Sequence, residues 1–275
     1  MKKLAPFICI FLMVISCNKE NTYKQASTSS SSSGKSIMAI YSHSDDESPI
    51  LPILSKYSRD GVTIYLVTVT DGSKGVTPHA QIPVGDSLTK VREDEAMCIT
   101  KTLGINPPIL LNYADDELAL RENIYSLDDK IDSLFKKYQP DVVITWGADG
   151  GYGHPDHRIV SDIVTEVFQA KDSIPNQLLY VGWPTENPLS EHQFKTDLAN
   201  YFAENLHKTQ MKYLTYQIPY DEKDIQVVRE AISCYKSQFT TEEQEEVFSL
   251  IVQPEKTIYF RPFFGSNIVV KDIFE

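Results

Sequence analysis

Residues Val62–Thr70 read VTIYLVTVT, the clearest strand pattern in the chain. β-Branched and aromatic residues dominate this run, and such residues favour extended backbone. Upstream, Ser36–His43 is a short apolar run that also predicts a buried strand. Between the two, Pro49–Arg59 has the apolar spacing of a helix and is stopped by Gly61. The sequence therefore predicts a strand–helix–strand unit at the start of the fold.

The same alternation continues toward the C-terminus. Helices are predicted over Ser87–Leu103, Ser126–Tyr138, Asp156–Ala170, Ile225–Gln238 and Glu242–Ile251, and strands over Ile109–Asn112, Asp141–Trp146, Leu178–Trp183 and Thr257–Arg261. Strands separated by helices indicate an α/β fold, a Rossmann-like three-layer sandwich with a mostly parallel sheet. In such sheets, ligands bind at the carboxyl ends of the strands, so we expect the active site there.

The N-terminal residues have the pattern of an export signal followed by a linker. Residues 1–17 combine Lys2 and Lys3 with an apolar core that ends at Cys17, which predicts a lipoprotein signal peptide with Cys17 as the lipidated residue. An ordinary secretory signal is the alternative. Residues 18–35 contain five serines in a row and predict a flexible tether, which leaves residues 36–275 as one domain. The sequence thus predicts an extracytoplasmic bacterial lipoprotein that is anchored to a membrane by lipid alone.

Charge and cysteine content limit the possible partners. The formal charge is −12, and loss of Lys2 and Lys3 with the signal makes it about −14. Such an acidic chain is a poor partner for nucleic acid and for polybasic attachment to anionic lipid. Beyond the signal, only Cys98 and Cys234 remain. They could form a disulfide or lie buried as thiols, and the sequence leaves both open.

Three consecutive acids follow a histidine where the first predicted strand ends. Ile40–Glu47 reads IYSHSDDE, so that His43, Asp45, Asp46 and Glu47 are crowded together. Neighbouring carboxylates repel one another, and burying one is costly without a positive partner. A metal ion is the obvious partner. The alternative is that Asp45 or Asp46 caps the helix after Pro49.

A second polar motif follows the predicted strand Asp141–Trp146. Residues 147–157 read GADGGYGHPDH, a glycine-rich loop in which Pro155 suits the first turn of a helix. His154 and His157, three residues apart, would point to roughly the same side of that helix. Taken alone, this motif could be no more than a capped helix start. Together with the first motif it predicts a hydrolytic zinc site, in which His43, Asp46 and His157 leave coordination positions open for water and substrate.

These motifs resemble those of the PIG-L/LmbE family, the zinc-dependent de-N-acetylases of glucosamine derivatives. Ser42–Glu47 aligns with the family's Ala-His-Pro-Asp-Asp-Glu, and His154–His157 is its His-Pro-Asp-His intact. Thr70–Gly75 is similar to its Thr-Asp-Gly loop. Arg92 with Glu95, and Tyr235–Gln238, resemble two further elements. Ser42 and Ser44 replace the family's alanine and proline, and neither change removes a ligand.

The resemblance assigns roles to individual residues. It implies zinc ligands at His43, Asp46 and His157, with Asp45 as general base. It implies that His154 assists the tetrahedral intermediate and that Asp156 orients an imidazole. Three further residues have two open readings each. Tyr152 is an oxyanion donor or an aromatic residue at the rim of the site. Arg92 contacts substrate or forms a surface ion pair, and Asp71 contacts the sugar or only shapes a turn.

The predicted function is a metal-dependent hydrolase that removes acetyl from an N-acetylated amino sugar, such as a glycan or glycolipid of the N-acetylglucosamine type. One alternative is a sugar-binding lipoprotein on the same fold that has lost turnover, as Ser44 in place of proline could suggest. Another alternative keeps the site but holds Fe²⁺, because two histidines and one carboxylate also suit ferrous oxygenases. The mostly parallel sheet disfavours that class.

Overall fold

The computed structural model describes residues 34–170, 175–186, 193–265 and 267–275. The signal peptide, Cys17 and nearly all of the Ser-rich tether lie outside the described residues. The strands are β1 Ser36–Tyr41, β2 Thr63–Thr70, β3 Ile109–Tyr113, β4 Val142–Thr145, β5 Gln177–Pro184, β6 Lys208–Thr209, β7 Tyr216–Pro219 and β8 Thr257–Pro262. The helices are α1 Leu51–Arg59, α2 Asp86–Leu103, α3 Arg121–Tyr138, α4 Gly150–Gly153, α5 Pro155–Ala170, α6 Asp197–Asn205, α7 Glu222–Ile232 and α8 Thr241–Ile251, with short 3₁₀ turns η1 Ser48–Ile50 and η3 Met211–Tyr213. Among these helices, none is both long and apolar enough to cross a membrane.

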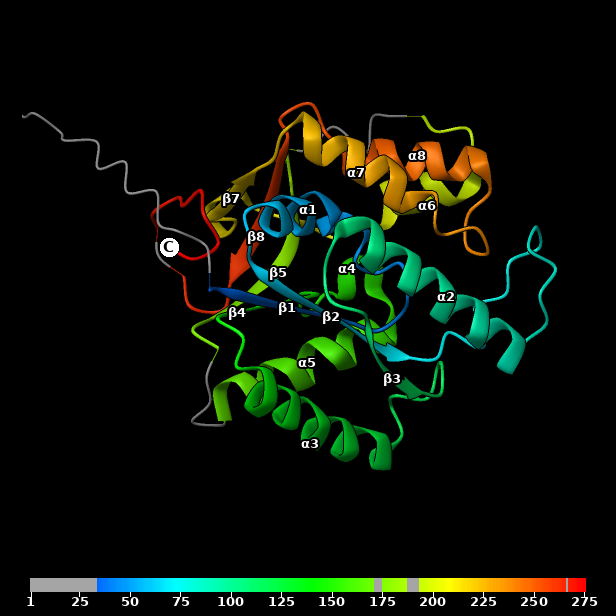
Figure 1. Ribbon diagram of the computed structural model, residues 1–275. Helices are drawn as coiled ribbons and strands as arrows, with labels where there is room; N and C mark the ends of the chain where they lie inside the picture. Colours follow the sequence, from blue (N-terminus) through cyan, green and yellow to red (C-terminus); the bar gives the residue numbers. More distant parts are fainter. Residues whose placement is uncertain (1–33, 171–174, 187–192, 266) are drawn as a thin grey trace, which may run out of the picture. The chain divides into compact units, whose positions relative to one another are not determined.

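The strands of the described residues form one sheet in the order β3-β2-β1-β4-β5-β8-β7, with β6 paired to β5 (Figure 1). The pairs from β3 to β5 are all parallel. The final strand, β8, lies antiparallel between β5 and β7. The predicted mostly parallel sheet is therefore confirmed.

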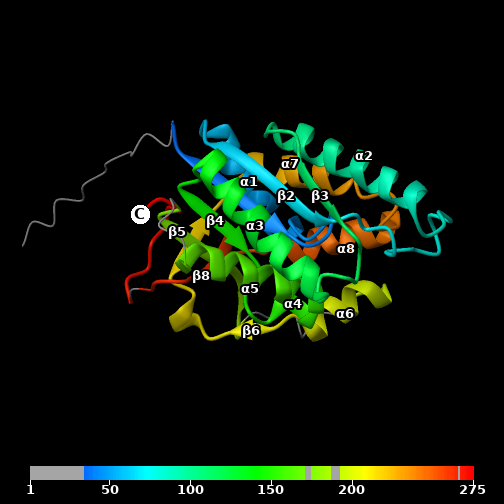
Figure 2. The ribbon, with the colours of Figure 1, turned by 90° about the horizontal axis from the view of Figure 1, so that it is seen from below.

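Helices cover both faces of this sheet, as the two views show (Figures 1 and 2). On one face, α3 and α5 pack their apolar residues against the strands, with Phe135 and Val164 fully buried. On the other face, α1, α2, α7 and α8 enclose a second core around Leu54 and Tyr235. Burial of apolar area on both faces is the main favourable contribution to folding here. The three-layer prediction is confirmed.

Three predicted helix boundaries were wrong, and the first is the start of α7, which lies at Glu222 and not at the predicted Ile225. Helix α7 ends at Ile232, whereas the sequence predicted that it reaches Gln238. The chain turns instead because Ser237 N and Gln238 Nε2 donate to the buried carboxylate of Glu95, at 2.5 and 3.2 Å. Helix α3 starts at Arg121, one turn before the predicted start, in a stretch where apolar spacing is weak. Elements α6, β6 and β7 were not predicted at all.

A disulfide joins Cys98 on α2 to Cys234, which follows α7. The two residues are separated by 136 positions in the sequence. The sequence left open whether the two cysteines pair or remain thiols. The fold brings their two elements together on one face of the sheet, and they pair. The bond ties α2 to the segment that includes Tyr235.

Strand register sets the position of the two polar motifs. Ala39 of β1 pairs with Ile144 of β4, so the two strands run side by side and end at the same edge of the sheet. The loops that carry the first and second motifs both leave from that edge. Because parallel strands present their carboxyl ends together, the motifs meet although they lie about one hundred residues apart in sequence.

Candidate metal and active site

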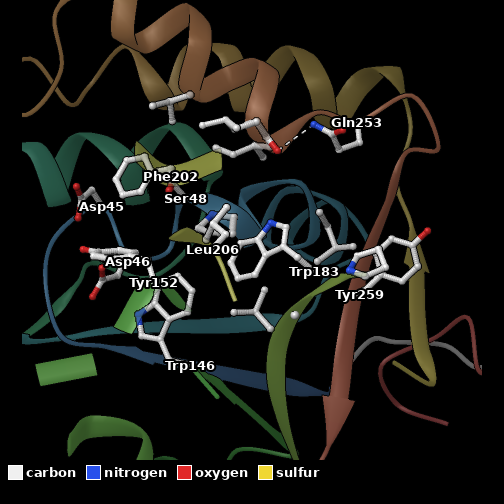
Figure 3. A pocket seen from close by; sticks show the side chains of 18 of the residues that line it. Asp45, Asp46, Ser48, Trp146, Tyr152, Trp183, Phe202, Leu206, Gln253 and Tyr259 are labelled. Atoms are coloured by element: carbon white, nitrogen blue, oxygen red, sulfur yellow. Dashed lines mark hydrogen bonds between the residues drawn. The ribbon is translucent and has the colours of Figure 1, made fainter. Parts of the chain in front are cut away.

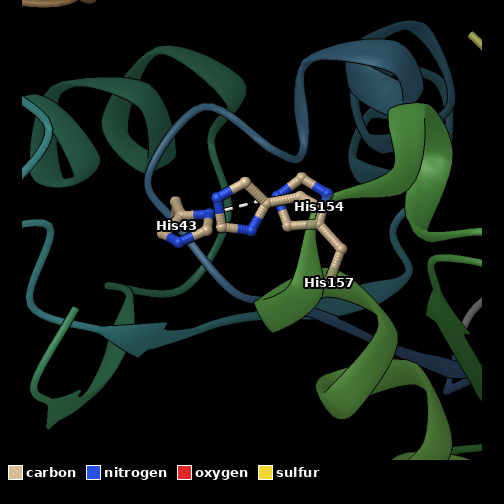
Figure 4. Close-up of side chains that lie close together, drawn as sticks. All are labelled: His43, His154 and His157. Atoms are coloured by element: carbon tan, nitrogen blue, oxygen red, sulfur yellow. Dashed lines mark hydrogen bonds between the residues drawn. The ribbon is translucent and has the colours of Figure 1, made fainter. Parts of the chain in front are cut away.

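His43, Asp46 and His157 converge at the carboxyl ends of β1 and β4. The Nδ1 atom of His43 lies 3.1 Å from Nε2 of His157. The two carboxylate oxygens of Asp46 lie 3.4 Å from His43 Nδ1 and 3.0 Å from His157 Nε2. Figure 4 shows the rings of His43 and His157 facing one another, with His154 beside them. The three residues predicted as metal ligands are thus gathered at one point.

The donor set of this cluster fits a small divalent cation. Ligands about 2.0–2.1 Å from a tetrahedral zinc ion lie roughly 3.3 Å from one another, close to the three separations seen here. Two imidazole nitrogens and one carboxylate oxygen are also the ligand types that zinc accepts in open hydrolytic sites. The residues present therefore fit a metal of this kind, and His154 lies beside them, with its ring 4.8 Å from that of His157.

His157 is fixed in the orientation that a metal ligand requires. Its Nδ1 donates to the carbonyl of Gly150 at 3.0 Å, which leaves the lone pair of Nε2 facing the cluster. The indole of Trp146 stacks flat on the imidazole, with the planes 2° apart. At Gly151, φ is +72° and an added Cβ would lie 2.7 Å from the Trp146 ring. The glycine-rich loop therefore allows the backbone to pack against Trp146, a residue whose role sequence reasoning missed.

His43 is held through its other ring nitrogen. Its Nε2 lies 3.2 Å from Asp115 Oδ1 and 3.6 Å from Asp156 Oδ2. Burial lowers the pKa of His43, but hydrogen bonds to Asp115, Asp156 and Asp46 outweigh it and raise that pKa well above its usual value. A carboxylate behind a histidine in this way orients a metal-binding ring. Asp156 lies close to the His43 ring, and its role in orienting an imidazole stays a prediction. Asp115 was missed although its place after β3 is another strand carboxyl end.

Asp45 sits beside the cluster in a strained turn. Its φ is 111°, and its backbone N–H donates to Glu47 Oε2 at 3.1 Å. Burial and the neighbouring charges of Asp46 and Glu47 raise the pKa of Asp45 well above its usual value. The capping alternative does not hold, since the residue at the N-cap of η1 is Glu47 and no side chain caps it. Asp46 Oδ2 instead accepts from the backbone N–H of His43 at 2.8 Å.

Glu47 stabilises the turn that contains Asp45. Its Oε1 accepts a hydrogen bond from the hydroxyl of Tyr235 at 2.8 Å, and the side chain is almost fully buried. Burial raises the pKa of Glu47 to about 7. Glu47 is the N-cap residue of η1, and through the hydrogen bond from Asp45 N it also holds that residue in place.

His154 and Tyr152 lie on the open side of the cluster. The Nδ1 atom of His154 accepts from the backbone N–H of Asp156 at 3.2 Å, so this ring also caps the first turn of α5. Burial and the nearby charges of His43 and His157 lower the pKa of His154. The Tyr152 ring packs edge-on to His157, with centroids 5.1 Å apart. Both residues border the space above Asp45 and His43.

Arg92 and Asp71 make contacts within the protein. Arg92 is buried and donates to Gly75 O at 2.6 Å and to Glu95 Oε2 at 3.4 Å, so it forms a buried ion pair, not a surface one. Asp71 Oδ1 accepts from the backbone N–H groups of Ser73 and Asp115 and so shapes the turn after β2. Arg92 also borders the polar space beside His43, and its contact with substrate stays a prediction, as does that of Asp71.

The segment that carries this site matches a known protein family. Residues 38–168 match the PIG-L family, described as GlcNAc-PI de-N-acetylase. This segment is a PIG-L family domain. It contains both polar motifs and every predicted metal ligand.

Known relatives of the PIG-L domain include two actinobacterial enzymes. A 1D-myo-inositol 2-acetamido-2-deoxy-alpha-D-glucopyranoside deacetylase of Catenulispora acidiphila is 30% identical over 149 residues, covering 46% of this chain and 49% of that protein. A mycothiol S-conjugate amidase of Streptomyces coelicolor is 26% identical over 151 residues, covering 48% and 51%. The chain thus spans about half the length of the curated relatives it matches.

A solved structure has the same fold over most of the chain. The N,N'-diacetylchitobiose deacetylase of Pyrococcus horikoshii superposes with a TM-score of 0.56 at 19% identity, covering 83% of this chain and 84% of that one. At this identity the likeness concerns the fold, and the site must be argued from its own residues.

Proposed function

We propose that this protein is a zinc-dependent amide hydrolase that removes the acetyl group from an N-acetylated amino sugar of the N-acetylglucosamine type. His43, Asp46 and His157 would hold the metal. When bound, zinc lowers the pKa of a coordinated water and polarises the amide carbonyl. The observation that carries the proposal is the convergence of these three ligands, 3.0 to 3.4 Å apart, directly beside Asp45.

The protein's own groups supply the proton transfers in this mechanism. Asp45, with its pKa raised by burial, accepts the proton of the attacking water. His154 has its proton on Nε2, since Nδ1 already accepts from Asp156 N, and it donates to the carbonyl oxygen as negative charge develops. Tyr152 borders the same space and provides a second donor. Asp115 and Asp156 keep His43 in place throughout.

Acetate release by the purified full-length chain, supplied with one equivalent of zinc, tests this proposal. A panel of N-acetylated glucosamine derivatives serves as substrate. In Asp45→Asn we expect kcat to fall by about 10²- to 10⁴-fold, because the base is lost while the ligands remain. Metal content should stay near one ion per chain.

The matched control is Asp60→Asn, the same change at an exposed residue after α1, which should leave kcat unaltered. Equal rates in Asp45→Asn and the unmodified chain would overturn the role of Asp45. Tight sugar binding without acetate release by the unmodified chain would favour the sugar-binding alternative.

We also propose export and lipid attachment at Cys17. The signal peptide and Cys17 lie outside the residues that the structure describes. Tethering outside the cytoplasm would direct the enzyme to glycans or glycolipids of the cell envelope. Mass spectrometry of the mature N-terminus tests this point. A chain that begins at a lipidated Cys17 is expected, and a chain that retains residues 1–16 would contradict it.

A further inference from the structure

An elongated cavity starts at the catalytic turn and leads away from it between α6, α8 and β5 (Figure 3). Asp45 and Asp46 lie at one end, Trp183 and Leu206 in the middle and Tyr259 at the other end. The volume that the centres of water-sized molecules can occupy within it is about 90 Å³. Apart from the carboxylates at its start and a few polar groups at its far rim, the cavity is lined by aromatic and aliphatic side chains.

Most of this apolar lining lies outside the PIG-L match. Trp183 belongs to β5, Phe202 to α6 and Leu250 to α8, all C-terminal to residue 168. Leu250 packs with α6 in a small apolar cluster that includes Trp183 and Phe202. Trp183 also stacks on Trp146, with centroids 5.9 Å apart, which joins the cavity to the metal site. The cavity is thus a feature of this chain's own C-terminal part.

A second, polar space also borders this turn. Lys74, Arg92, Asp115 and Asp116 border it together with His43. Asp45 and Tyr152 border both the polar space and the apolar cavity. A bond held at Asp45 therefore lies next to both a polar space and an apolar cavity.

An amide substrate has an amine half and an acyl half, and the polarity of each half decides whether it fits the polar space or the apolar cavity. Sugar hydroxyls need hydrogen-bond partners and would be left without them in the apolar cavity. The polar space offers carboxylates and cations to the amine half, which carries the sugar. The acyl half then enters the apolar cavity, where the single methyl of an acetyl group would leave most of the space unfilled.

This reasoning rests on the proposed amide hydrolysis and names its substrate more closely. We infer that the preferred acyl group is a medium-length or longer fatty acyl chain, so that the enzyme is an N-acyl amino sugar deacylase. Water adds to the amide carbon and the C–N bond breaks. The nitrogen leaves as an ammonium group that has taken both protons of that water, and the acyl group leaves as a fatty carboxylate that keeps its oxygen.

The test compares N-acetyl- and N-octanoyl-glucosamine as substrates of the full-length chain with zinc, by release of the free amine. We expect kcat/KM to be at least about tenfold higher for the octanoyl amide, since each additional buried methylene favours it. A third substrate, the octyl glycoside of N-acetylglucosamine, carries the chain on the sugar instead. A kcat/KM that is higher than that of N-acetylglucosamine for the octyl glycoside, but not for the octanoyl amide, would overturn the assignment of the acyl half.

A variant with a narrowed cavity provides the second measurement. Leu206→Trp replaces a leucine at a half-buried position of the cavity by a larger, aromatic side chain. It should lower the ratio of kcat/KM for the octanoyl amide to kcat/KM for the acetyl amide by about tenfold or more. Leu120→Trp makes the same change at a position that is 45% exposed and away from the cavity, and the ratio should not change. An unchanged ratio in Leu206→Trp would contradict the inference.

The outcomes separate this inference from the function on which it rests. Cleavage of the acetyl amide at a rate equal to or above that of the octanoyl amide would overturn the acyl preference and leave the hydrolase standing. No cleavage of either amide by the zinc-loaded chain would overturn the hydrolase itself, and the acyl preference with it.

Discussion

At Asp45 the backbone adopts a conformation that residues other than glycine rarely occupy. Strain of this kind costs on the order of 1–3 kcal/mol and persists only where surrounding contacts impose it. Here those contacts run from Asp45 N to Glu47 and from Glu47 to Tyr235, which lies nearly two hundred residues further along the chain. The position of the proposed general base is therefore set by residues that take no part in the chemistry.

We predict that Tyr235→Phe lowers kcat about ten- to a hundredfold and changes KM little, because Glu47 loses the donor that fixes its carboxylate. The free energy of unfolding should fall by about 1–3 kcal/mol, since a buried acceptor loses its partner. Steady-state kinetics and thermal denaturation measure the two effects. Tyr213→Phe, at a residue that is 52% exposed, is the control and should change neither. A normal kcat in Tyr235→Phe would show that the turn does not depend on this contact.

At the residue scale, motif spacing was sufficient to predict that His43, Asp46 and His157 belong together. Each belongs to a motif that follows a predicted strand, and parallel strands bring their carboxyl ends to one edge. Among the supporting residues, Asp115 follows the predicted strand Ile109–Asn112 and could have been found by the same rule. The roles of Trp146 and Tyr235 could not, because they depend on packing between elements distant in sequence.

At the scale of elements, the disulfide between Cys98 and Cys234 joins α2 to the segment that holds Tyr235 and Gln238. The same two elements also meet through Glu95, which accepts from Ser237 N and Gln238 Nε2. The covalent link and the buried hydrogen bonds therefore support the same contact. A long loop closed by a disulfide restricts the unfolded chain strongly.

Replacing both cysteines by serine should lower the free energy of unfolding by about 2–4 kcal/mol. For a chain of this size, that corresponds to a fall in Tm of roughly 5–15 °C. Thermal denaturation of the double variant measures the change, and added reductant should destabilise the unmodified chain but leave the double variant unaffected. Equal Tm values for the two proteins would contradict a structural role for this bond.

Strong local patterns were sufficient to predict most elements before the structure was known. The β-branched run of β2 and the amphipathic spacing of α2 gave boundaries within one or two residues. Prediction failed where long-range contacts override local propensity, as where α7 stops at Ile232 so that Ser237 can reach Glu95. It also failed for α6 and β6, which are short and draw their stability from neighbours such as α8 and β5.

At the scale of the whole molecule, the parallel sheet places the proposed cation site next to both a polar space and an apolar cavity. The PIG-L segment supplies the proposed ligands, and the C-terminal part after residue 168 supplies most of the apolar lining. The fold class could be predicted from the alternation of strands and helices. The cavity could not, because its lining residues come from β5, α6, α8 and β8 and gather only in three dimensions.

The central claim is that His43, Asp46 and His157 hold one metal ion, and metal content tests it most directly. The full-length chain is loaded with zinc, freed of excess by dialysis and assayed by elemental analysis beside His43→Gln, Asp46→Asn and His157→Gln. The control is His79→Gln, a histidine whose ring contacts the Lys236 carbonyl on the surface. We predict about one zinc per chain in the unmodified protein and in the control, and close to none in the three variants. Full occupancy in the three variants, or none in the unmodified chain, would contradict the account.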